Sequence, residues 1–228
     1  MKEPISIIIA AYQTQDYIEE CLDSIENQTY FNNNKNYEIL VGVDGCQETL
    51  NKLIKIRNKY NNLKIIKMLS NKGSYITLNT LLSLVKFDNI IKFDSDDIML
   101  SNLIEEIMNI NGDLIRFMYY KYNEKNNEKR KCDDYANGCY YINKKVYNIL
   151  NGYQPWRFSA DTEFLLRFKQ LNLFKEVKIN KPLFYYRQHN HSLTKTVPIH
   201  QRVLYHNKFK NKKLNINITS VVNDFEVI

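Results

Sequence analysis

The first 100 residues alternate regularly between short apolar runs and segments whose apolar residues recur at helical spacing. The run 5–11 is rich in Ile and almost wholly apolar, which is typical of a strand buried on both faces. In the segment after it, Asp16 with Glu19 indicates a capping box at a helix start. Such alternation predicts an α/β fold with a mostly parallel central sheet flanked by helices. The predicted strands are 5–11, 37–43, 63–69 and 89–93, and the predicted helices lie at about 16–25, 50–57 and 76–85.

The second half of the chain is less regular and predicts a smaller mixed β region. We find no internal repeat and no linker, so we expect one domain over 1–228, with halves 1–100 and 101–195 and a basic tail 196–228. The charged stretch 121–134 indicates a solvated hairpin or loop. The other predicted elements are helices at 103–110, 143–150 and 162–171, strands at 114–120, 174–179 and 183–187, and a helical start to the tail as far as Lys210.

Charge and composition limit the classes of function. Lys and Arg number 32 against 25 Asp and Glu, which gives a net charge of +7 and invites a nucleic-acid interpretation. The chain is also rich in Asn, Ile and Tyr with only 6 Gly, so biased composition explains much of the excess. No apolar run is long enough to span a bilayer, and no signal peptide is evident. We therefore expect a soluble, cytoplasmic protein without an integral membrane segment, whose four cysteines are buried thiols rather than disulfides or metal ligands.

Polar residues follow each predicted strand of the first half. Ligands of parallel α/β sheets bind at the carboxyl ends of the strands, so these positions are the candidate site. Tyr12 follows the first strand, Asp44 and Gly45 follow the second, and the acidic segment 94–97 follows the fourth. The segment 71–73, Asn-Lys-Gly, follows the third strand.

The acidic group is the segment 94–97, Asp-Ser-Asp-Asp. Like charges so close together repel one another, and a divalent cation with oxygen ligands such as Mg²⁺ or Mn²⁺ would offset that repulsion. Alternate side chains at a strand end point the same way, so Asp94 and Asp96 can face one ligand. The alternative is a polar turn in which Asp97 caps a following helix. The position at the end of the fourth strand favours the metal interpretation.

An ordered set of segments resembles family 2 glycosyltransferases of the GT-A fold. The set spans about 3–195 and begins with Ile-Ser-Ile-Ile-Ile-Ala-Ala-Tyr at 5–12. This resemblance implies an inverting transfer of a sugar, hexosyl or N-acetylhexosaminyl, from a nucleotide-diphosphate donor, expected to be a UDP-sugar. The expected acceptor is a hydroxyl of a glycan, a lipid-linked molecule or a protein, and not a nucleic acid. The other segments are Leu-Asp-Ser-Ile-Glu-Asn-Gln-Thr at 22–29, Ile-Leu-Val-Gly-Val-Asp-Gly at 39–45, Asn-Lys-Gly at 71–73 with Asn79, Phe-Asp-Ser-Asp-Asp at 93–97, Asn-Gly-Tyr at 151–153, Ala-Asp-Thr-Glu-Phe-Leu-Leu-Arg at 160–167 and Tyr-Arg-Gln-His-Asn-His-Ser at 186–192.

The same resemblance implies roles for individual residues. Asp44 would accept a hydrogen bond from the base, Asp94 would contact the ribose, and Asp96 would hold Mn²⁺ or Mg²⁺ against the diphosphate. His189, or less closely His191, matches a position that often ligates the metal, against the alternative of a packed histidine. The implied donor-binding residues are Ala11, Tyr12, Asp44, Lys72, Gly73, Asp94, Ser95, Asp96 and Arg187.

The implied general base is Asp161, which would take the proton of the acceptor hydroxyl. The family usually has an acidic pair here, and Ala160 replaces the first acid, so acceptor contacts of that acid are in doubt. The alternative is that Ser159 or Asp161 only caps the predicted helix. Trp156 and Arg157 lie just before the base and are candidate acceptor contacts, with a core anchor the alternative for Trp156.

Two other classes of function stay open. A sugar-1-phosphate nucleotidyltransferase shares a related architecture, but the glycine-rich loop of that class is missing after the first strand, and no G-x-G-x-x-G indicates a dinucleotide enzyme. A basic nucleic-acid or polyanion-binding module without catalysis would use Tyr- and Lys-rich stretches at 117–131 and 208–213, and its binding would weaken steeply with salt. The joint presence of Asp44, Asp94, Asp96 and Asp161 argues against an inactive glycosyltransferase.

Overall fold

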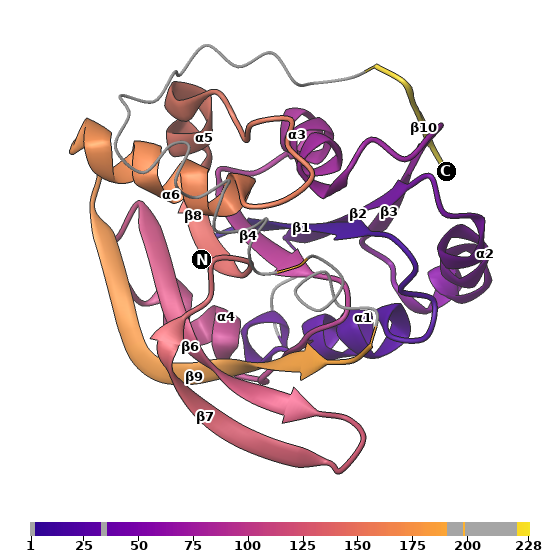
Figure 1. Cartoon of the computed structure of the whole chain (residues 1–228), viewed down its shortest axis with the longest axis horizontal. Helices are drawn as coiled ribbons and strands as arrows, with labels where there is room; N and C mark the ends of the chain where they lie inside the picture. Colours follow the sequence, from indigo (N-terminus) through magenta and orange to yellow (C-terminus); the bar gives the residue numbers. More distant parts are fainter. Residues whose placement is uncertain (1–2, 33–35, 191–197, 199–222) are drawn as a thin grey trace.

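The structure is a computed structural model that describes residues 3–32, 36–190, 198 and 223–228. Within those residues, one mixed sheet has the strand order β10-β3-β2-β1-β4-β8-β6-β9-β5, and β7 pairs with β6 (Figure 1). The strands are β1 Ile5–Ala11, β2 Tyr37–Asp44, β3 Leu63–Met68, β4 Asn89–Asp94, β5 Ile98–Met99, β6 Leu114–Asn123, β7 Glu128–Tyr135, β8 Tyr140–Asn143, β9 Glu176–Gln188 and β10 Phe225–Val227. The helices are α1 Ile18–Glu26, α2 Gln47–Ile56, α3 Ser74–Leu84, α4 Leu103–Met108, α5 Lys144–Leu150 and α6 Ala160–Leu171, with short 3₁₀ turns at Thr29–Phe31 and Arg57–Lys59.

The four strands of the first half form the predicted parallel array. β1 lies between β2 and β4, and β3 lies beyond β2, all in parallel. Side chains alternate across a strand, so Ile7 and Ile9 pack with α1, α2 and α4 on one face, and Ile8 packs with α3, α5 and α6 on the other. A strand buried on both faces needs the continuous apolar run seen in the sequence, and the predicted α/β class with a mostly parallel sheet is confirmed.

The second half adds antiparallel pairs and a long final strand. β8 runs antiparallel to β4, β6 and β7 form the predicted hairpin, and β9 runs parallel to β6 and antiparallel to β5. Figure 1 shows the hairpin extending from the body of the sheet beside β9. β9 is one strand where two were predicted, because Pro182, which has no N–H to donate, is accommodated by register shifts beside Met118.

Helices α5 and α1 differ in the groups that accept hydrogen bonds from the backbone N–H groups of their first turns. α5 begins as predicted, with Asn143 accepting a hydrogen bond from the Lys145 N–H at 3.1 Å. The capping box predicted at Asp16 is wrong. α1 begins at Ile18 without a side-chain cap, and the Thr14 carbonyl accepts the backbone N–H groups of Tyr17 and Ile18 instead.

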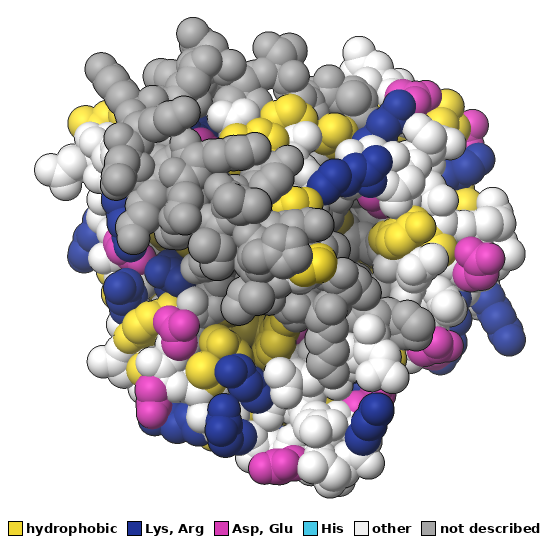
Figure 2. Space-filling view, viewed as in Figure 1, with side chains coloured by type: hydrophobic (Ala, Val, Ile, Leu, Met, Phe, Trp, Pro, Cys, Tyr) yellow, Lys and Arg dark blue, Asp and Glu magenta, His cyan; other side chains and the backbone are white. Residues whose placement is uncertain are grey.

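The remaining predictions concern cysteines, charge and the tail. Cys21, Cys46 and Cys139 are buried free thiols, as expected, whereas Cys132 is a free thiol that is partly exposed. On the face in Figure 2, basic and acidic side chains lie interspersed. No helix in the described part of the chain has the length and apolarity to cross a membrane. The predicted tail helix and His191 lie outside the described residues, whereas 225–227 form β10 beside β3.

Candidate active site

Asp44, the last residue of β2, fixes the loop that follows β3. Its carboxylate is buried and accepts the backbone N–H groups of Lys72 and Gly73, at 2.7 and 2.9 Å. Gly73 has φ +98°, a backbone conformation that residues other than glycine rarely adopt. Each carboxylate oxygen retains a further lone pair. The structure therefore brings Asp44, Lys72 and Gly73 together, as predicted for one wall of a donor site.

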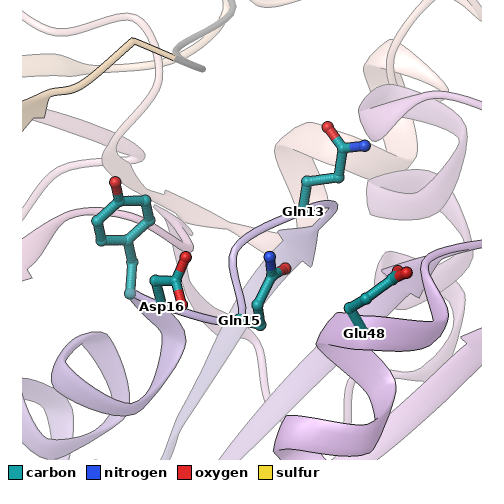
Figure 3. Close-up of a pocket in the computed structure, with 5 residues that line it drawn as sticks. Gln13, Gln15, Asp16 and Glu48 are labelled. Atoms are coloured by element: carbon teal, nitrogen blue, oxygen red, sulfur yellow. The ribbon is translucent and has the colours of Figure 1, made fainter.

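An open polar pocket of about 410 Å³ lies beside the end of β1. Gln13 and Gln15 from the loop after β1 and Glu48 from the first turn of α2 border the same space (Figure 3). Asp16 and Tyr17 complete the lining. None of these residues was predicted as part of the site, because they form no motif there, and only the rule that loops after parallel strands carry ligands pointed to them. Two residues at the end of β1 were predicted to bind the donor: Ala11 is buried and Tyr12 is exposed.

Asp94 ends β4 and is paired with a lysine of the same strand. The Lys92 ammonium donates to Asp94 Oδ1 at 2.7 Å and to the Gly138 carbonyl, and the two side chains are 5% and 37% exposed. A Cβ at Gly138 would collide with the Asp94 carboxylate. Lys92 lies within a central strand and was not predicted as part of the site. A buried ammonium needs a counter-charge, and Asp94 supplies it.

Asp96 faces a histidine from the end of β9. His189 Nε2 lies 2.8 Å from Asp96 Oδ2, so the two residues predicted as metal ligands are neighbours. Ser95 is buried between the acidic residues. The alternative in which Asp97 caps a helix is wrong: the buried Asp97 carboxylate accepts the Arg187 backbone N–H at 2.9 Å, and β5 follows it.

Burial and mutual repulsion both act on the pKa values of Asp94 and Asp97. Burial, together with the charges of Asp96 and Asp161, raises the pKa of Asp94, although Lys92 opposes that shift. Burial and then the charges of Asp96 and Asp94 raise the pKa of Asp97 well above its usual range. A divalent cation would relieve this repulsion, and carboxylate oxygens with one imidazole are a ligand set that suits Mn²⁺. Asp94, Asp97 and Cys139 also place ligand atoms within 4.8 Å of one another. The acidic loop therefore fits a divalent cation, and Asp96 and His189 as its ligands stay a prediction.

Asp161 lies in the first turn of α6. Its Oδ1 accepts the backbone N–H of Thr162 at 2.7 Å, whereas Ser159, with φ +63°, makes no side-chain cap. Burial first and then the neighbouring Asp161 carboxylate raise the pKa of Tyr75 well above its usual range. Because Asp161 also raises the pKa values of Asp94 and Lys92, the predicted base lies within electrostatic reach of the carboxylate cluster.

A buried ion pair fixes α6. Arg167 pairs with Glu163 at 2.6 Å, and both side chains are buried. The same guanidinium donates to the carbonyls of Leu150 and Gly152, the latter at 2.8 Å. The ion pair therefore ties the helix that carries Asp161 to the end of α5, which fixes the position of that carboxylate relative to the sheet.

The two predicted acceptor residues differ in their surroundings: Arg157 contacts the loop after β3, and Trp156 packs against the core. Arg157 is exposed and hydrogen-bonds to the Asn71 side chain and, at 3.3 Å, to its carbonyl. Its Cδ would lie 3.3 Å from a Cβ added at Gly73. Trp156 is partly buried and packs against the core beneath α3 and α6, so the alternative of a core anchor also describes its position. Arg157 therefore bridges the second half of the chain to the loop held by Asp44.

The Arg187 side chain is buried and bonded to other groups of the protein. Its guanidinium, 3% exposed, donates to the Asp96 carbonyl at 2.8 Å and to Glu124 at 2.8 Å, and it also pairs with Glu20. The sequence assigned this residue to the diphosphate. In the structure its acceptors are protein groups, so the contact with phosphate stays a prediction.

The comparison with known proteins identifies the family. The sequence profile described as glycosyl transferase family 2 matches residues 6–174, and the chain belongs to that family. The glycosyltransferase GlyG of Streptococcus pneumoniae is 26% identical over 193 residues, which are 78% of this chain and 60% of GlyG. The O-antigen biosynthesis glycosyltransferase WbnJ of Escherichia coli is 27% identical over 218 residues, 84% of this chain and 82% of WbnJ.

Solved structures agree on the fold. TarS of S. aureus in complex with UDP-GlcNAc superposes with a TM-score of 0.71 at 17% identity, covering 93% of this chain and 68% of that one. The mannosyltransferase PcManGT of Pyrobaculum calidifontis, with GDP-Man and Mn²⁺, gives 0.72 at 12% identity, covering 94% and 66%. The GT-A fold predicted from the sequence is confirmed. The chain spans 60% of the length of GlyG.

Proposed function

We propose that this chain is an inverting, divalent-metal-dependent glycosyltransferase that moves a sugar from a UDP-sugar to a hydroxyl acceptor. The observation that carries the proposal is the meeting of three groups at the carboxyl end of β4. These groups are the Asp96–His189 pair, the Asp94–Lys92 pair and Asp161 in the first turn of α6. Transfer from a nucleotide-diphosphate donor needs three functions there: an anchor for the diphosphate, polar contacts for the ribose, and a base for the acceptor hydroxyl.

The donor would lie along the ends of the parallel strands. The pocket beside β1 offers amide and carboxylate groups, and Asp44 keeps lone pairs that can accept from a base. TarS was solved with UDP-GlcNAc and PcManGT with GDP-Man, so UDP is the first donor to test and GDP the second. Lys72 and Arg157 border the same edge and would place positive charge near the diphosphate.

The reaction is a displacement at the anomeric carbon. An Oδ atom of Asp161 takes the proton of the acceptor hydroxyl as its oxygen bonds to that carbon. The bond to the diphosphate oxygen breaks with its electron pair, and UDP departs. Asp96 and His189 would hold a divalent ion, which would supply Lewis-acid stabilisation of that leaving group. Attack from the face opposite the diphosphate inverts the anomeric configuration.

The acceptor is proposed to be a glycan, a lipid-linked molecule or a protein that presents a hydroxyl beside Arg157 and Trp156. Among similar proteins, the poly(ribitol-phosphate) beta-glucosyltransferase of Bacillus spizizenii is 36% identical over 95 residues, 41% of this chain and 15% of that protein. WbnJ is named for O-antigen biosynthesis. These names favour a bacterial surface glycan as the first acceptor class to test.

A thermal-shift screen with UDP-, GDP- and dTDP-sugars, each with Mn²⁺ or with EDTA, tests the proposal. We expect one nucleotide class, UDP, to raise the melting temperature only when Mn²⁺ is present, and Asp96→Asn to remove that rise. Lys131→Ala, on the exposed edge of the β6–β7 hairpin, is the matched control and should behave like the wild type. A melting temperature that no nucleotide sugar shifts, with or without Mn²⁺, would contradict the proposal.

A further inference from the structure

Arg187 connects three segments that are distant in the sequence. Its guanidinium pairs with Glu20 in α1 and, at 2.8 Å, with Glu124 in the turn after β6. It also donates from Nε to the Asp96 carbonyl at 2.8 Å, while the Arg187 backbone N–H binds the Asp97 carboxylate at 2.9 Å. α1, the β6–β7 hairpin and the acidic loop are thus joined by one residue of β9.

Aromatic rings complete the surroundings of this guanidinium. Its central carbon lies 5.0 Å from the Tyr17 ring centre and 5.3 Å from that of Tyr122, distances at which a cation is attracted to the ring face. Tyr17 also packs against the His189 ring, with centroids 4.5 Å apart. A guanidinium fork with fixed acceptors and rings on its faces has little freedom to move. It therefore holds the groups that it contacts in fixed positions.

The groups it contacts are those that would hold the metal. Arg187 and His189 are two residues apart near the end of β9, and alternate residues of an extended chain project the same way. One contacts the backbone of Asp96 and the other contacts its carboxylate. Residues that contact the metal's ligands rather than the metal itself orient those ligands and tune the affinity for the ion.

We propose that Arg187, held by Glu20 and Glu124, is a positioning residue that fixes Asp96 and His189 for the metal. This proposal rests on the proposed function and assigns Arg187 a role other than contact with the diphosphate. Glu20 and Glu124 decide between those roles, because two carboxylates paired with the guanidinium would repel a diphosphate brought to it. Their negative charges instead hold the cation against the acidic loop.

Titration of Mn²⁺ into the protein mixed with a large excess of UDP, followed by calorimetry, tests this role without any transfer reaction. Arg187→Lys keeps the charge but loses the fork, and we expect it to weaken Mn²⁺ binding about 10–100-fold, as is usual for partners behind the ligands. Glu20→Gln, on a side chain that is 56% exposed, should weaken Mn²⁺ binding in the same direction by a smaller factor. Arg116→Lys changes another buried arginine, bound to the Tyr135 carbonyl, and should leave Mn²⁺ affinity unchanged.

Uridine and UDP binding in EDTA, measured at ligand concentrations high enough to detect the weakened metal-free binding, separate positioning from direct contact. With positioning, Arg187→Lys binds both ligands like the wild type when no metal is present. A contact with phosphate would predict that Arg187→Lys loses affinity for UDP but not uridine in EDTA, and that Glu20→Gln binds UDP more tightly. Either result would overturn the proposal.

The outcomes also separate this proposal from the proposed function. Wild-type protein that binds no UDP with Mn²⁺ would contradict the function itself. Wild-type binding together with unchanged Mn²⁺ affinity in Arg187→Lys and Glu20→Gln would overturn only the positioning role. Glu20→Gln alters a largely exposed side chain on the surface of α1, so it provides a folded variant even if the arginine variant proves unstable.

Discussion

Asp94 and Asp96 are two residues apart, yet different parts of the molecule hold them. Asp94 faces α6: its partner is Lys92 of the same strand, and Asp161 adds charge from the start of that helix. Asp96 faces β9, where His189 contacts its carboxylate and Arg187 binds its carbonyl. We call these the α6 side and the β9 side of the acidic loop.

The difference between the two sides suggests a division of work. The α6 side already contains a cation, the Lys92 ammonium, so Asp94 is balanced without a metal. The β9 side offers a carboxylate and an imidazole, which are metal ligands. We therefore expect proton transfer and donor contacts to depend on the α6 side and metal binding to depend on the β9 side. Variants on each side test that separation.

The largest effect is expected from Asp161→Asn on the α6 side. Loss of the general base should lower the rate of sugar transfer about 10²–10⁴-fold. UDP affinity with Mn²⁺ should stay at the wild-type level, because the β9 side is untouched. The transfer rate and calorimetric UDP binding are measured on the same preparation. Transfer at the wild-type rate would remove Asp161 from the mechanism.

On the β9 side, Asp96→Asn should weaken Mn²⁺-dependent UDP binding by more than the roughly 10–100-fold typical of outer partners. An amide ligates a divalent ion less well than a carboxylate, and it also changes the contact with His189. UDP titrations with Mn²⁺ and with EDTA measure the effect. If Asp94→Asn lost as much Mn²⁺ dependence as Asp96→Asn, the two sides would not divide the work as we describe.

The free energy of unfolding should depend more on Asp94, on the α6 side, than on Asp96, on the β9 side. Asp94→Asn leaves the buried Lys92 ammonium without its counter-charge and should cost about 3 kcal/mol, the lower end for a broken buried pair, because Asp94 is partly exposed. Asp96→Asn breaks no such pair and should change the free energy of unfolding by less than about 1 kcal/mol. Urea unfolding of both variants measures the contrast, and equal losses would contradict it.

The smallest effect is expected outside both sides. Lys72 pairs with Asp224 at 3.2 Å, with both side chains about a third or more exposed. Exposed pairs contribute about 0–1 kcal/mol, so Lys72→Ala should barely change unfolding by urea. Any effect should instead be on UDP affinity, through the charge near the diphosphate. A large loss of stability would show that this loop depends on more than the Asp44 hydrogen bonds.

Sequence reasoning predicted the features that have a local pattern better than those made by long-range contacts. The parallel strands were predicted because a doubly buried strand has a short-range signature, and Asp94 and Asp96 follow the fourth strand directly. The partners of Arg187 could not be predicted, because Glu20 and Glu124 lie 167 and 63 residues away in the chain.

Two local features also escaped prediction, for different reasons. Lys92 in a central strand carries no signal that it will be buried beside an acid, because lysine is rarely buried and its partner is found only through the sheet. The polar residues of the pocket, such as Gln13 and Glu48, form no motif, and only the fold brings them together. The predicted cap at Asp16 failed because the Thr14 carbonyl satisfies the first turn of α1.

UDP titrated into the wild-type protein, first with Mn²⁺ and then with EDTA, tests the central claim most directly. The claim is that the acidic loop, with His189, forms a metal-dependent site for a nucleotide-diphosphate donor. The account predicts saturable binding of one UDP per chain with Mn²⁺, and binding that EDTA abolishes or weakens strongly. UDP binding of equal affinity in both conditions, or no binding in either, would contradict it.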